Sequence, residues 1–151
     1  MKIRIRKYKT SDWEAISKIH DESRLDELKG TVDLNAFIPL STVAFTEGLF
    51  GGEILVAEYE QKGGSEVSGF IGFNKKTIDW LYVSPSHYRK GIGKLLMKSA
   101  LEKLNGEIRI AVLKNNLPAF ELYKKMGFVE ERIGAAQYES EGILLKWNGK
   151  E

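Results

Sequence analysis

Residues 78–97 read Ile-Asp-Trp-Leu-Tyr-Val-Ser-Pro-Ser-His-Tyr-Arg-Lys-Gly-Ile-Gly-Lys-Leu-Leu-Met. The first six residues are mostly aromatic and aliphatic, as in a largely buried strand, and Pro85 ends that strand because proline cannot donate to a ladder. Beyond the turn, apolar or small residues recur at i, i+3, i+4 and i+7, which is the spacing of one face of a helix. The residues at this spacing are Ile92, Leu95, Leu96 and the small Ser99. The stretch therefore predicts a strand, a turn and a helix.

The turn between this strand and this helix contains two glycines, Gly91 and Gly93. Glycines let the backbone come close to a ligand, and the N–H groups at a helix N-terminus attract an anion. Arg89, Lys90 and Lys94 add cationic side chains that can bind phosphate. We therefore predict a phosphate-binding turn. The alternative is a glycine-bearing turn with a solvated basic rim.

Two other nucleotide-binding motifs do not fit the turn. The P-loop spacing Gly-x-x-x-x-Gly-Lys-Ser/Thr is missing, and no Ser or Thr follows to hold magnesium. A dinucleotide fingerprint needs three glycines near the start of a domain and an acid about 20 residues later. This turn has only two glycines and lies past the midpoint of the chain, so it does not match the dinucleotide fingerprint.

The composition is that of an ordinary globular protein, and a chain of 151 residues predicts a single domain, residues 1–151. A net charge of +2 gives no support for a nucleic-acid or membrane partner. The chain has no cysteine and only two histidines, His20 and His87, so we expect no metal site. Residues 1–6 alternate charge with isoleucine, which predicts neither a signal peptide nor a membrane span, and we expect a cytoplasmic protein.

The remaining periodicity predicts strands and helices along the whole chain. Strands are expected at residues 2–8, 53–60, 67–74, 78–83, 107–112, 128–133 and 141–147. Helices are expected at residues 13–22, 34–38, 41–49 and 91–104, and between Asn116 and Gly127. The predicted fold class is α/β (α+β), with a mixed, mainly antiparallel sheet of about six or seven strands and helices on both faces.

Two segments resemble motifs of one known family. Residues 88–93, Tyr-Arg-Lys-Gly-Ile-Gly, are similar to Gln/Arg-x-x-Gly-x-Gly/Ala, which follows a strand ending in Leu-Tyr-Val. Residues 116–128, Asn-Leu-Pro-Ala-Phe-Glu-Leu-Tyr-Lys-Lys-Met-Gly-Phe, are similar to Asn-x-x-Ala-x-x-Leu-Tyr-x-Lys-x-Gly-Phe. Both are motifs of the GNAT superfamily of acyl-CoA-dependent N-acyltransferases, and the resemblance is strong over residues 69–128. Tyr88 departs from the pattern, because the family usually has Gln or Arg there.

The resemblance implies an N-acetyltransferase that passes the acetyl group of acetyl-CoA directly to a primary amine in a ternary complex. It also implies that the fourth and fifth strands splay, so that backbone groups near Leu81 and Val83 bind the pantetheine arm as an added strand would. The cofactor-binding residues that it implies are Leu81, Val83, Arg89, Lys90, Gly91, Ile92, Gly93, Lys94, Asn116 and Tyr123.

The resemblance also assigns catalytic roles. Tyr123 matches the family tyrosine that acts as general acid to the coenzyme A thiolate, and the alternative is a tyrosine that packs with Phe120 and Met126. Some members have a base in the fifth strand, where this chain has Ala111, and others have one in the fourth strand, where this chain has Asp79. Asp79 is thus the candidate base, with an edge or rim carboxylate as its other interpretation, and the alternatives are His87 and a water chain that relays the ammonium proton. His20 is interpreted as a helix residue at the core margin, with a catalytic role as its alternative.

Three matters stay open at the level of sequence. The acceptor, a small-molecule or peptide amine, is not identified, because the segment that shapes the acceptor pocket in the family is the least family-like part of this chain. An amino acid, a polyamine, an aminoglycoside, a peptide N-terminus and a protein lysine are all open. The alternative to an enzyme is a non-catalytic acyl-CoA-binding sensor module. The oligomeric state is open between a monomer and a homodimer, and no nucleic-acid or membrane partner is expected.

Overall fold

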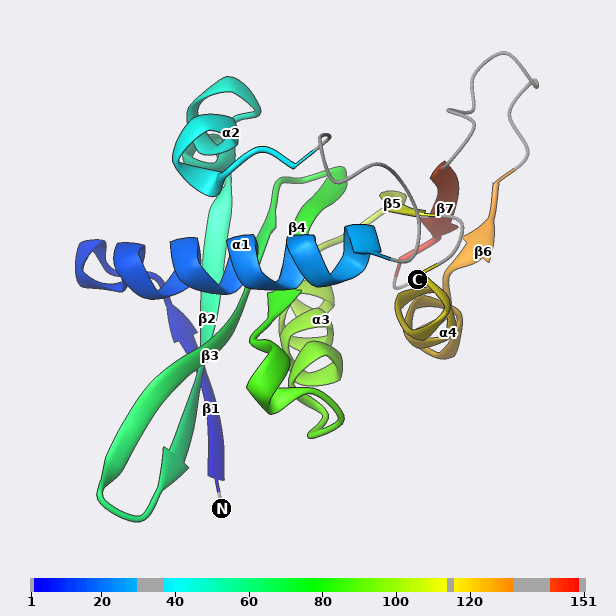
Figure 1. Ribbon diagram of the computed structural model, residues 1–151. Helices are drawn as coiled ribbons and strands as arrows, with labels where there is room; N and C mark the ends of the chain where they lie inside the picture. The colour runs from blue at the N-terminus through cyan, green and yellow to red at the C-terminus, as the bar shows by residue number, and fades with distance from the viewer. Residues whose placement is uncertain (1, 30–36, 114–115, 132–141, 150–151) are drawn as a thin grey trace.

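The computed structural model describes residues 2–29, 37–113, 116–131 and 142–149 (Figure 1). The strands are β1 (Lys2–Lys7), β2 (Glu53–Gln61), β3 (Gly64–Phe73), β4 (Thr77–Val83), β5 (Ile108–Leu113), β6 (Val129–Glu130) and β7 (Gly142–Trp147). The α-helices are α1 (Trp13–Lys29), α2 (Leu40–Thr46), α3 (Ile92–Glu102) and α4 (Leu117–Lys125). Short 3-10 helices are η1 (Thr10–Asp12), η3 (Leu49–Gly51) and η4 (Pro85–His87).

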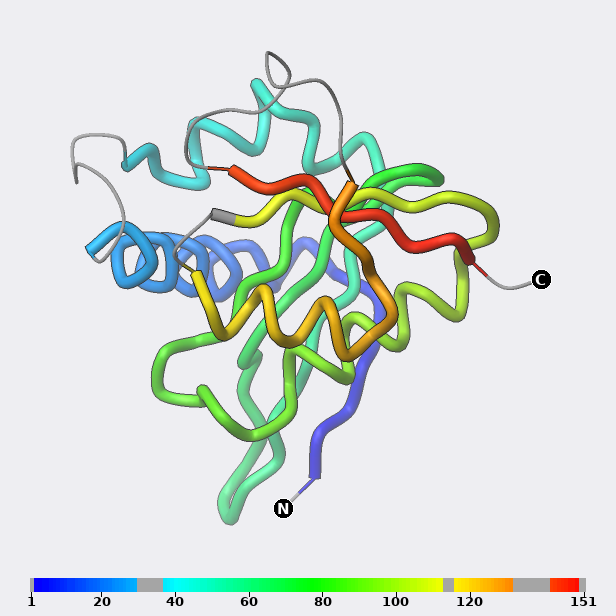
Figure 2. Tube along the Cα trace, turned by 90° about the vertical axis from the view of Figure 1, so that its right-hand side faces the viewer, coloured from blue at the N-terminus to red at the C-terminus, as the bar shows by residue number. Residues whose placement is uncertain are grey.

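The strands form a seven-stranded sheet in the order β1-β2-β3-β4-β5-β7-β6. All neighbours pair antiparallel except β4 and β5, which run parallel. Figure 2 shows β7 between β5 and β6 at the far end of the sheet. The mixed, mainly antiparallel sheet predicted from the sequence is confirmed, and the strands expected at residues 78–83 and 107–112 are neighbours.

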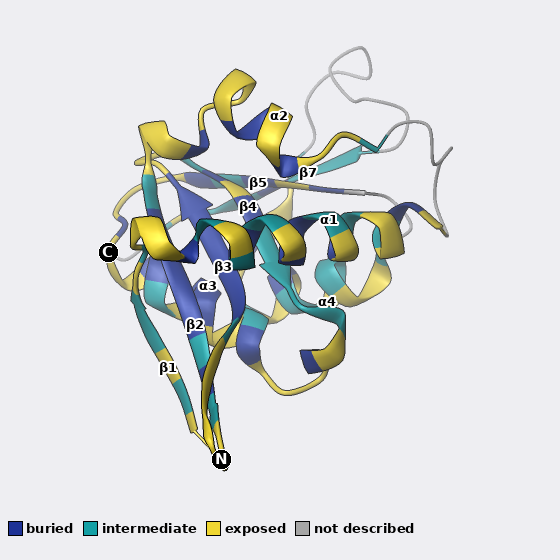
Figure 3. Ribbon diagram, turned by 60° about the vertical axis from the view of Figure 1, so that its left-hand side comes forward, coloured by how far each residue is buried: buried dark blue, intermediate teal, exposed yellow. Residues whose placement is uncertain are grey.

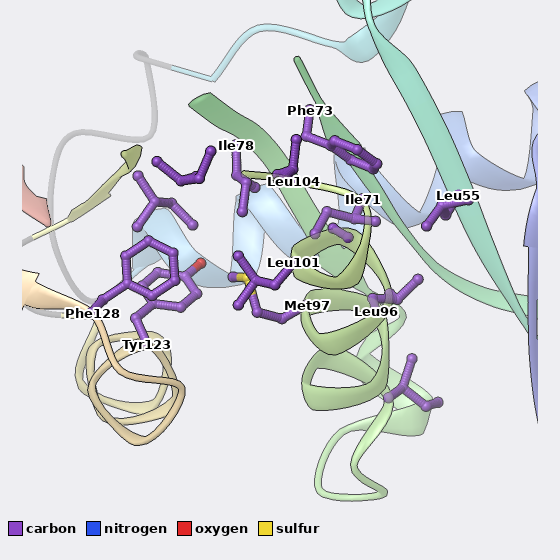
Figure 4. Close-up of a cluster of buried hydrophobic side chains, with 14 of the residues drawn as sticks. Leu55, Ile71, Phe73, Ile78, Leu96, Met97, Leu101, Leu104, Tyr123 and Phe128 are labelled. Atoms are coloured by element: carbon purple, nitrogen blue, oxygen red, sulfur yellow. The ribbon is translucent and has the colours of Figure 1, made fainter. Parts of the chain in front are cut away.

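Helices cover both faces of the sheet, and two hydrophobic clusters result (Figures 1 and 3). Alternate residues of a strand point to opposite faces, so Val56 and Phe70 pack under α1 and α2 while Leu55 and Ile71 pack against α3. Figure 4 shows the α3 side, where Tyr123 and Phe128 lie with Met97. Because helices cover the central strands on both faces, the sequences of these strands are mostly apolar and do not alternate regularly between apolar and polar residues.

The contact between β4 and β5 is short. It pairs Thr77 with Arg109 and Ile78 with Ile110. Immediately beyond, the register of β3 and β4 shifts between Gly72 and Phe73, which leaves Asp79 as the extra residue of a β-bulge. A bulge bends its strand and increases its twist. We call the space between the two strands, from Asp79 to the end of β4, the wedge.

Several element bounds differ from the prediction. Helix α1 continues to Lys29 instead of ending near residue 22, because Ser23 and Leu28 extend the buried stripe of the helix toward the sheet. The helix expected at residues 34–38 lies largely outside the described residues, as does the second half of the strand expected at 128–133. None of the described helices combines the length and the apolar character needed to cross a membrane, and the expected cytoplasmic location stays a prediction.

The start of α2 is attached to α1. Pro39 occupies the N-cap position and has no side-chain donor or acceptor to offer. Instead, Asp21 of α1 accepts the backbone N–H of Leu40 at 2.9 Å through Oδ1. The same oxygen lies 2.9 Å from Nδ1 of His20. One carboxylate of α1 thus satisfies a donor at the N-terminus of α2, which would otherwise have no intrahelical partner.

A buried ionic contact ties the first strand to the first helix. Asp12 is only 5% exposed, and its carboxylate accepts from Nη1 and Nη2 of Arg6 at 2.8 and 2.9 Å. It also accepts the backbone N–H of Lys9 at 2.8 Å. Arg6 pairs in addition with Glu58 of β2. The Arg6 hydrogen bonds hold the pKa of Asp12 below its usual value, against the opposite effect of burial.

We expect Asp12→Asn to lower the free energy of unfolding at pH 7 by about 2 kcal/mol, because the charged acceptor of a bidentate pair is lost. The contribution of a carboxyl with a depressed folded-state pKa is complete above its unfolded-state pKa and disappears as pH falls through the folded-state pKa. The difference between wild type and variant, measured by urea unfolding, should therefore shrink on acidification. The exposed Glu22→Gln on α1 is the control, and a wild-type advantage that does not change with pH would contradict the assignment.

Candidate functional site

The turn before α3 has the backbone geometry of an anion site. Gly91 is the N-cap of α3 with φ of 80°, and its carbonyl accepts the N–H of Leu95 at 3.1 Å. Arg89 also lies in the left-handed region, with φ of 64°, which costs a non-glycine residue about 1–2 kcal/mol. Left-handed residues in a turn help successive N–H groups face a common side, and such concave arrangements bind anions. The turn and the first N–H groups of α3 therefore offer donors to one ligand.

The two glycines of the turn are required for different reasons. A Cβ added at Gly91 would meet no atom within 4 Å, so glycine is needed there for its positive φ. A Cβ added at Gly93 would lie 3.3 Å from Cδ2 of Leu122 and 3.8 Å from Cγ2 of Val83. The start of α3, the end of β4 and helix α4 therefore meet at Gly93.

The side chains of the turn are cationic and exposed. Arg89, Lys90 and Lys94 are all open to solvent, and Nζ of Lys90 lies 5.3 Å from the ring centroid of Tyr59. Tyr88 stands at the position that departs from the family pattern, and its hydroxyl lies 3.2 Å from Oγ of Ser23 in α1. The departure thus replaces a basic or amide side chain with a link between the turn and α1.

His87 is buried below the turn and has partners on the side of the β2–β3 hairpin. Its Nε2 lies 3.0 Å from Oε1 of Glu66, and its Nδ1 lies 3.1 Å from Oγ of Ser86. Its ring meets the ring of Tyr59 edge-on at 4.9 Å. These contacts fix η4 to the sheet, and they place the histidine beside the anion turn rather than in the wedge.

Leu81 and Val83 lie in the part of β4 that borders the wedge. On one edge they pair with β3, opposite Ile71 and Gly69. On the other edge the pairing with β5 has ended at Ile78. The backbone groups that face the wedge are therefore positioned to accept an extended ligand in the manner of an added strand.

Tyr123 lies on the α4 side of the wedge and is 6% exposed (Figure 4). Its ring centroid is 6.1 Å from that of Phe128, and Phe120 and Met126 pack against the same cluster. Burial raises the pKa of the Tyr123 hydroxyl, and the negative charges of an ionised Tyr82 and of Glu27 act in the same direction. The phenol is therefore a protonated hydrogen-bond donor at neutral pH.

Asn116 caps α4, as the sequence predicted. Its Oδ1 accepts the N–H of Ala119 at 3.3 Å. Its Nδ2 donates to Oε2 of Glu27 in α1 at 2.6 Å. The amide thus has one role in the helix end and a second in a contact between α4 and α1.

Asp79 is exposed at the bulge, at the narrow end of the wedge, and accepts from Oγ1 of Thr77 at 3.0 Å. His20, the other histidine, is buried in α1. Its ring meets Tyr82 edge-on at 4.7 Å, and burial lowers its pKa against the raising effect of Asp21. His20 is a packed residue of the α1 face, in agreement with its interpretation as a helix residue at the core margin.

Glu27 belongs to this region, although no sequence motif marks it as a site residue. It lies in the last turns of α1, beyond residue 22, where the predicted helix ended. The helical spacing was nevertheless visible, because Ile16, His20, Ser23 and Glu27 are separated by four, three and four residues. Continuing that stripe would have placed Glu27 on the face of α1 that meets the sheet.

Comparison with known proteins identifies the family. The family described as "Acetyltransferase (GNAT) domain" matches residues 50–130, more than half of the chain. Streptothricin acetyltransferase of Streptomyces lavendulae is 33% identical over 87 residues, which are 55% of this chain and 46% of the relative. UPF0157 protein YqkA of Bacillus subtilis is 34% identical over 96 residues, 59% of this chain and 26% of the relative. The matches thus cover less than half the length of these two curated relatives.

Among solved structures, the PaiA N-acetyltransferase from Thermoplasma acidophilum, crystallised in complex with coenzyme A, aligns with a TM-score of 0.75. The alignment covers 98% of this chain and 99% of the other at 22% identity, and this likeness shows the fold. The family match includes the wedge, the anion turn and Tyr123. The chain therefore belongs to the GNAT acetyltransferase family.

Proposed function

We propose that this protein is an N-acetyltransferase that uses acetyl-CoA and a primary amine in a ternary complex. The observation that carries the proposal is the meeting point at Gly93. There the anion turn at the start of α3 touches both the end of β4, which borders the wedge, and α4, which carries Tyr123. A phosphate cradle, an open strand edge and a protonated phenol are thus contiguous.

The residues of the chain fit acetyl-CoA as donor. The space beside Gly91 is open, and the N–H groups of residues 89–94 with Arg89, Lys90 and Lys94 suit a pyrophosphate. The free edge of β4 at Leu81 and Val83 suits the amide groups of the pantetheine arm. Ile92 and Gly93 contribute backbone donors, and Asn116 is the proposed contact from α4. When bound, acetyl-CoA supplies an activated thioester.

Tyr123 is the proposed general acid. Because burial raises its pKa, the hydroxyl keeps its proton at neutral pH and can donate a hydrogen bond to sulfur as negative charge develops there. Each unit by which its pKa exceeds that of the thiol disfavours complete proton transfer by about 1.4 kcal/mol. The hydroxyl would therefore act as a hydrogen-bond donor to the sulfur and would supply its proton to the departing thiolate.

Asp79 is the proposed base on the acceptor side. It is exposed at the bulge, where the wedge is narrow, so a proton that leaves the acceptor ammonium can reach its carboxylate through water. The neutral amine then attacks the thioester carbonyl. Holding the two reactants together in one wedge supplies much of the rate by positioning.

The acceptor is proposed to be a small-molecule or peptide amine. The name of one relative, streptothricin acetyltransferase, supports a small-molecule acceptor. A sensor that binds acyl-CoA without chemistry remains the alternative, and it is favoured by Ala111 at a position where some members have an acid. Release of free thiol from acetyl-CoA in the presence of an amine panel decides between them, because only an enzyme produces it.

The anion turn is tested by Gly91→Val, with Gly106→Val as a matched control. Both glycines have φ of 80° and open space at Cβ, so both substitutions carry a similar conformational cost. Only Gly91 belongs to the turn, and we expect its substitution to raise the Kd for acetyl-CoA about tenfold, or 1.4 kcal/mol, in calorimetry. Equal affinities in two folded variants would remove the phosphate-cradle assignment.

The general acid is tested by Tyr123→Phe, which keeps the ring beside Phe128 and removes the proton. We expect kcat to fall about 10²-fold with little change in the affinity for acetyl-CoA. Tyr8→Phe, which removes the hydroxyl of a half-buried tyrosine after β1, is the control and should keep wild-type turnover. Suppose that chemistry is rate-limiting and the Tyr123→Phe variant keeps more than about half of the wild-type kcat. Tyr123 then has only a packing role.

The base is tested by Asp79→Asn, which keeps an oxygen for the hydroxyl of Thr77. We expect kcat/KM for the amine to fall about 10²-fold while the Kd for acetyl-CoA holds. The control is Glu14→Gln, which makes the same kind of change at an exposed acid in the first turn of α1. If the Asp79 variant is as active as the control, the ammonium proton leaves through water alone.

A further inference from the structure

Glu27 is a carboxylate that connects the two sides of the wedge. It belongs to α1, which lies across β4, and its Oε2 accepts from Nδ2 of Asn116 at the start of α4. Its Oε1 pairs with Arg24, one turn earlier in α1. The side chain is 18% exposed. The carboxylate therefore lies at the border of the wedge and is reachable from solvent.

The charge of Glu27 is felt by both phenols of this region. Burial raises the pKa of Tyr82 to about 12, and Glu27 adds to that shift while Arg24 opposes it. For Tyr123, Glu27 also raises the pKa, and no opposing charge contributes among the described residues. Both phenols therefore lie within electrostatic range of the Glu27 carboxylate, which is also paired with Arg24.

The anion turn and the contact between α1 and α4 offer different chemistry to a ligand. The turn has the exposed cations Arg89, Lys90 and Lys94, whereas the contact has the partly exposed carboxylate of Glu27, paired with Arg24. A polyanionic donor is favoured at the turn, and an ammonium group can bind at the carboxylate. The nitrogen that attacks the thioester must be neutral, so an ammonium bound at Glu27 has to be a different nitrogen of the acceptor.

We propose that Glu27 binds a second cationic group of the acceptor, so that the preferred acceptors are diamines or polyamines and not monoamines or amino acids. The assignment rests on the proposed function and specifies the substrate class of the same site. In this arrangement one ammonium donates to the Glu27 carboxylate in place of, or beside, the Asn116 amide. A second nitrogen of the same molecule then reaches the thioester end of the wedge.

The test uses the wild-type protein saturated with coenzyme A and a series of probes that differ only in charge. Straight-chain diamines of two to six carbons are compared by calorimetry with the monoamine and the ω-amino acid of equal length. We expect the best diamine to bind at least about tenfold more tightly than its monoamine, which corresponds to 1.4 kcal/mol, and the amino acid to bind more weakly still.

The variant arm uses Glu27→Gln, whose side-chain oxygen can still accept from Asn116 and whose charge is gone. We expect the diamine preference to fall to less than about twofold, while the Kd for coenzyme A stays unchanged. Glu22→Gln, the same change at an exposed position of α1, should keep the preference. If Glu27 only connects α1 to α4, the Glu27→Gln variant should have a lower Tm, and its folded fraction should keep the diamine preference.

Several outcomes would overturn the assignment. They are equal binding of diamine and monoamine by the wild type, no binding of any diamine, and a preference that survives in Glu27→Gln. The wild-type series decides the matter even if the variant does not fold. If coenzyme A itself does not bind, the proposed function fails; if it binds and the diamine preference is missing, only the role of Glu27 fails.

Discussion

The parting of β4 from β5 is the constraint on which the rest of this structure depends. A sheet is normally stabilised by pairing every backbone group, and an unpaired strand edge in the middle of a fold costs free energy unless water or a ligand satisfies it. Here the parallel contact ends after two residue pairs, at the bulge that contains Asp79. Beyond the bulge, β4 is not paired with β5, and an extended ligand is the proposed partner of that edge.

The two sides of the wedge must then be held together by something other than strand pairing. On one face α3 spans the gap, with Met97 and Leu101 in the same cluster as Tyr123 and Phe128 (Figure 4). On the other face α1 crosses β4 and reaches α4 through Glu27 and Asn116. Packing on one side and a charged hydrogen bond on the other keep the opening at a defined width.

The sequence predicted the parts of the site whose geometry is local. Gly91 could be recognised because a left-handed N-cap excludes most other residues, and Asn116 because a cap requires a side-chain acceptor one residue before the helix. The family motifs located Tyr123. The end of α1 was predicted wrongly, because Ser23 is buried and polar and broke the apolar pattern that marks a helix face.

Contacts between distant segments could not be predicted. Glu27 and Asn116 are 89 residues apart, and Tyr88 and Ser23 are 65 apart. The sequence around Glu27 or Asn116 does not indicate the other residue, because a Glu on a helix surface and an Asn at a helix N-cap need no distant partner. The contacts of His87 with Glu66 and Tyr59 depend in the same way on where the β2–β3 hairpin lies.

The Asp21 contact has a further consequence for how this protein opens and closes locally. Helix α2 has seven residues and begins at a proline that cannot cap it, so it has little stability of its own. Its first N–H is held by a carboxylate that belongs to α1. Fraying of α1 near His20 would release that donor, whereas fraying of α2 leaves α1 intact. We therefore expect the two helices to form a hierarchical unit of local unfolding, in which opening of α1 weakens the amide protection of α2 more than opening of α2 weakens that of α1.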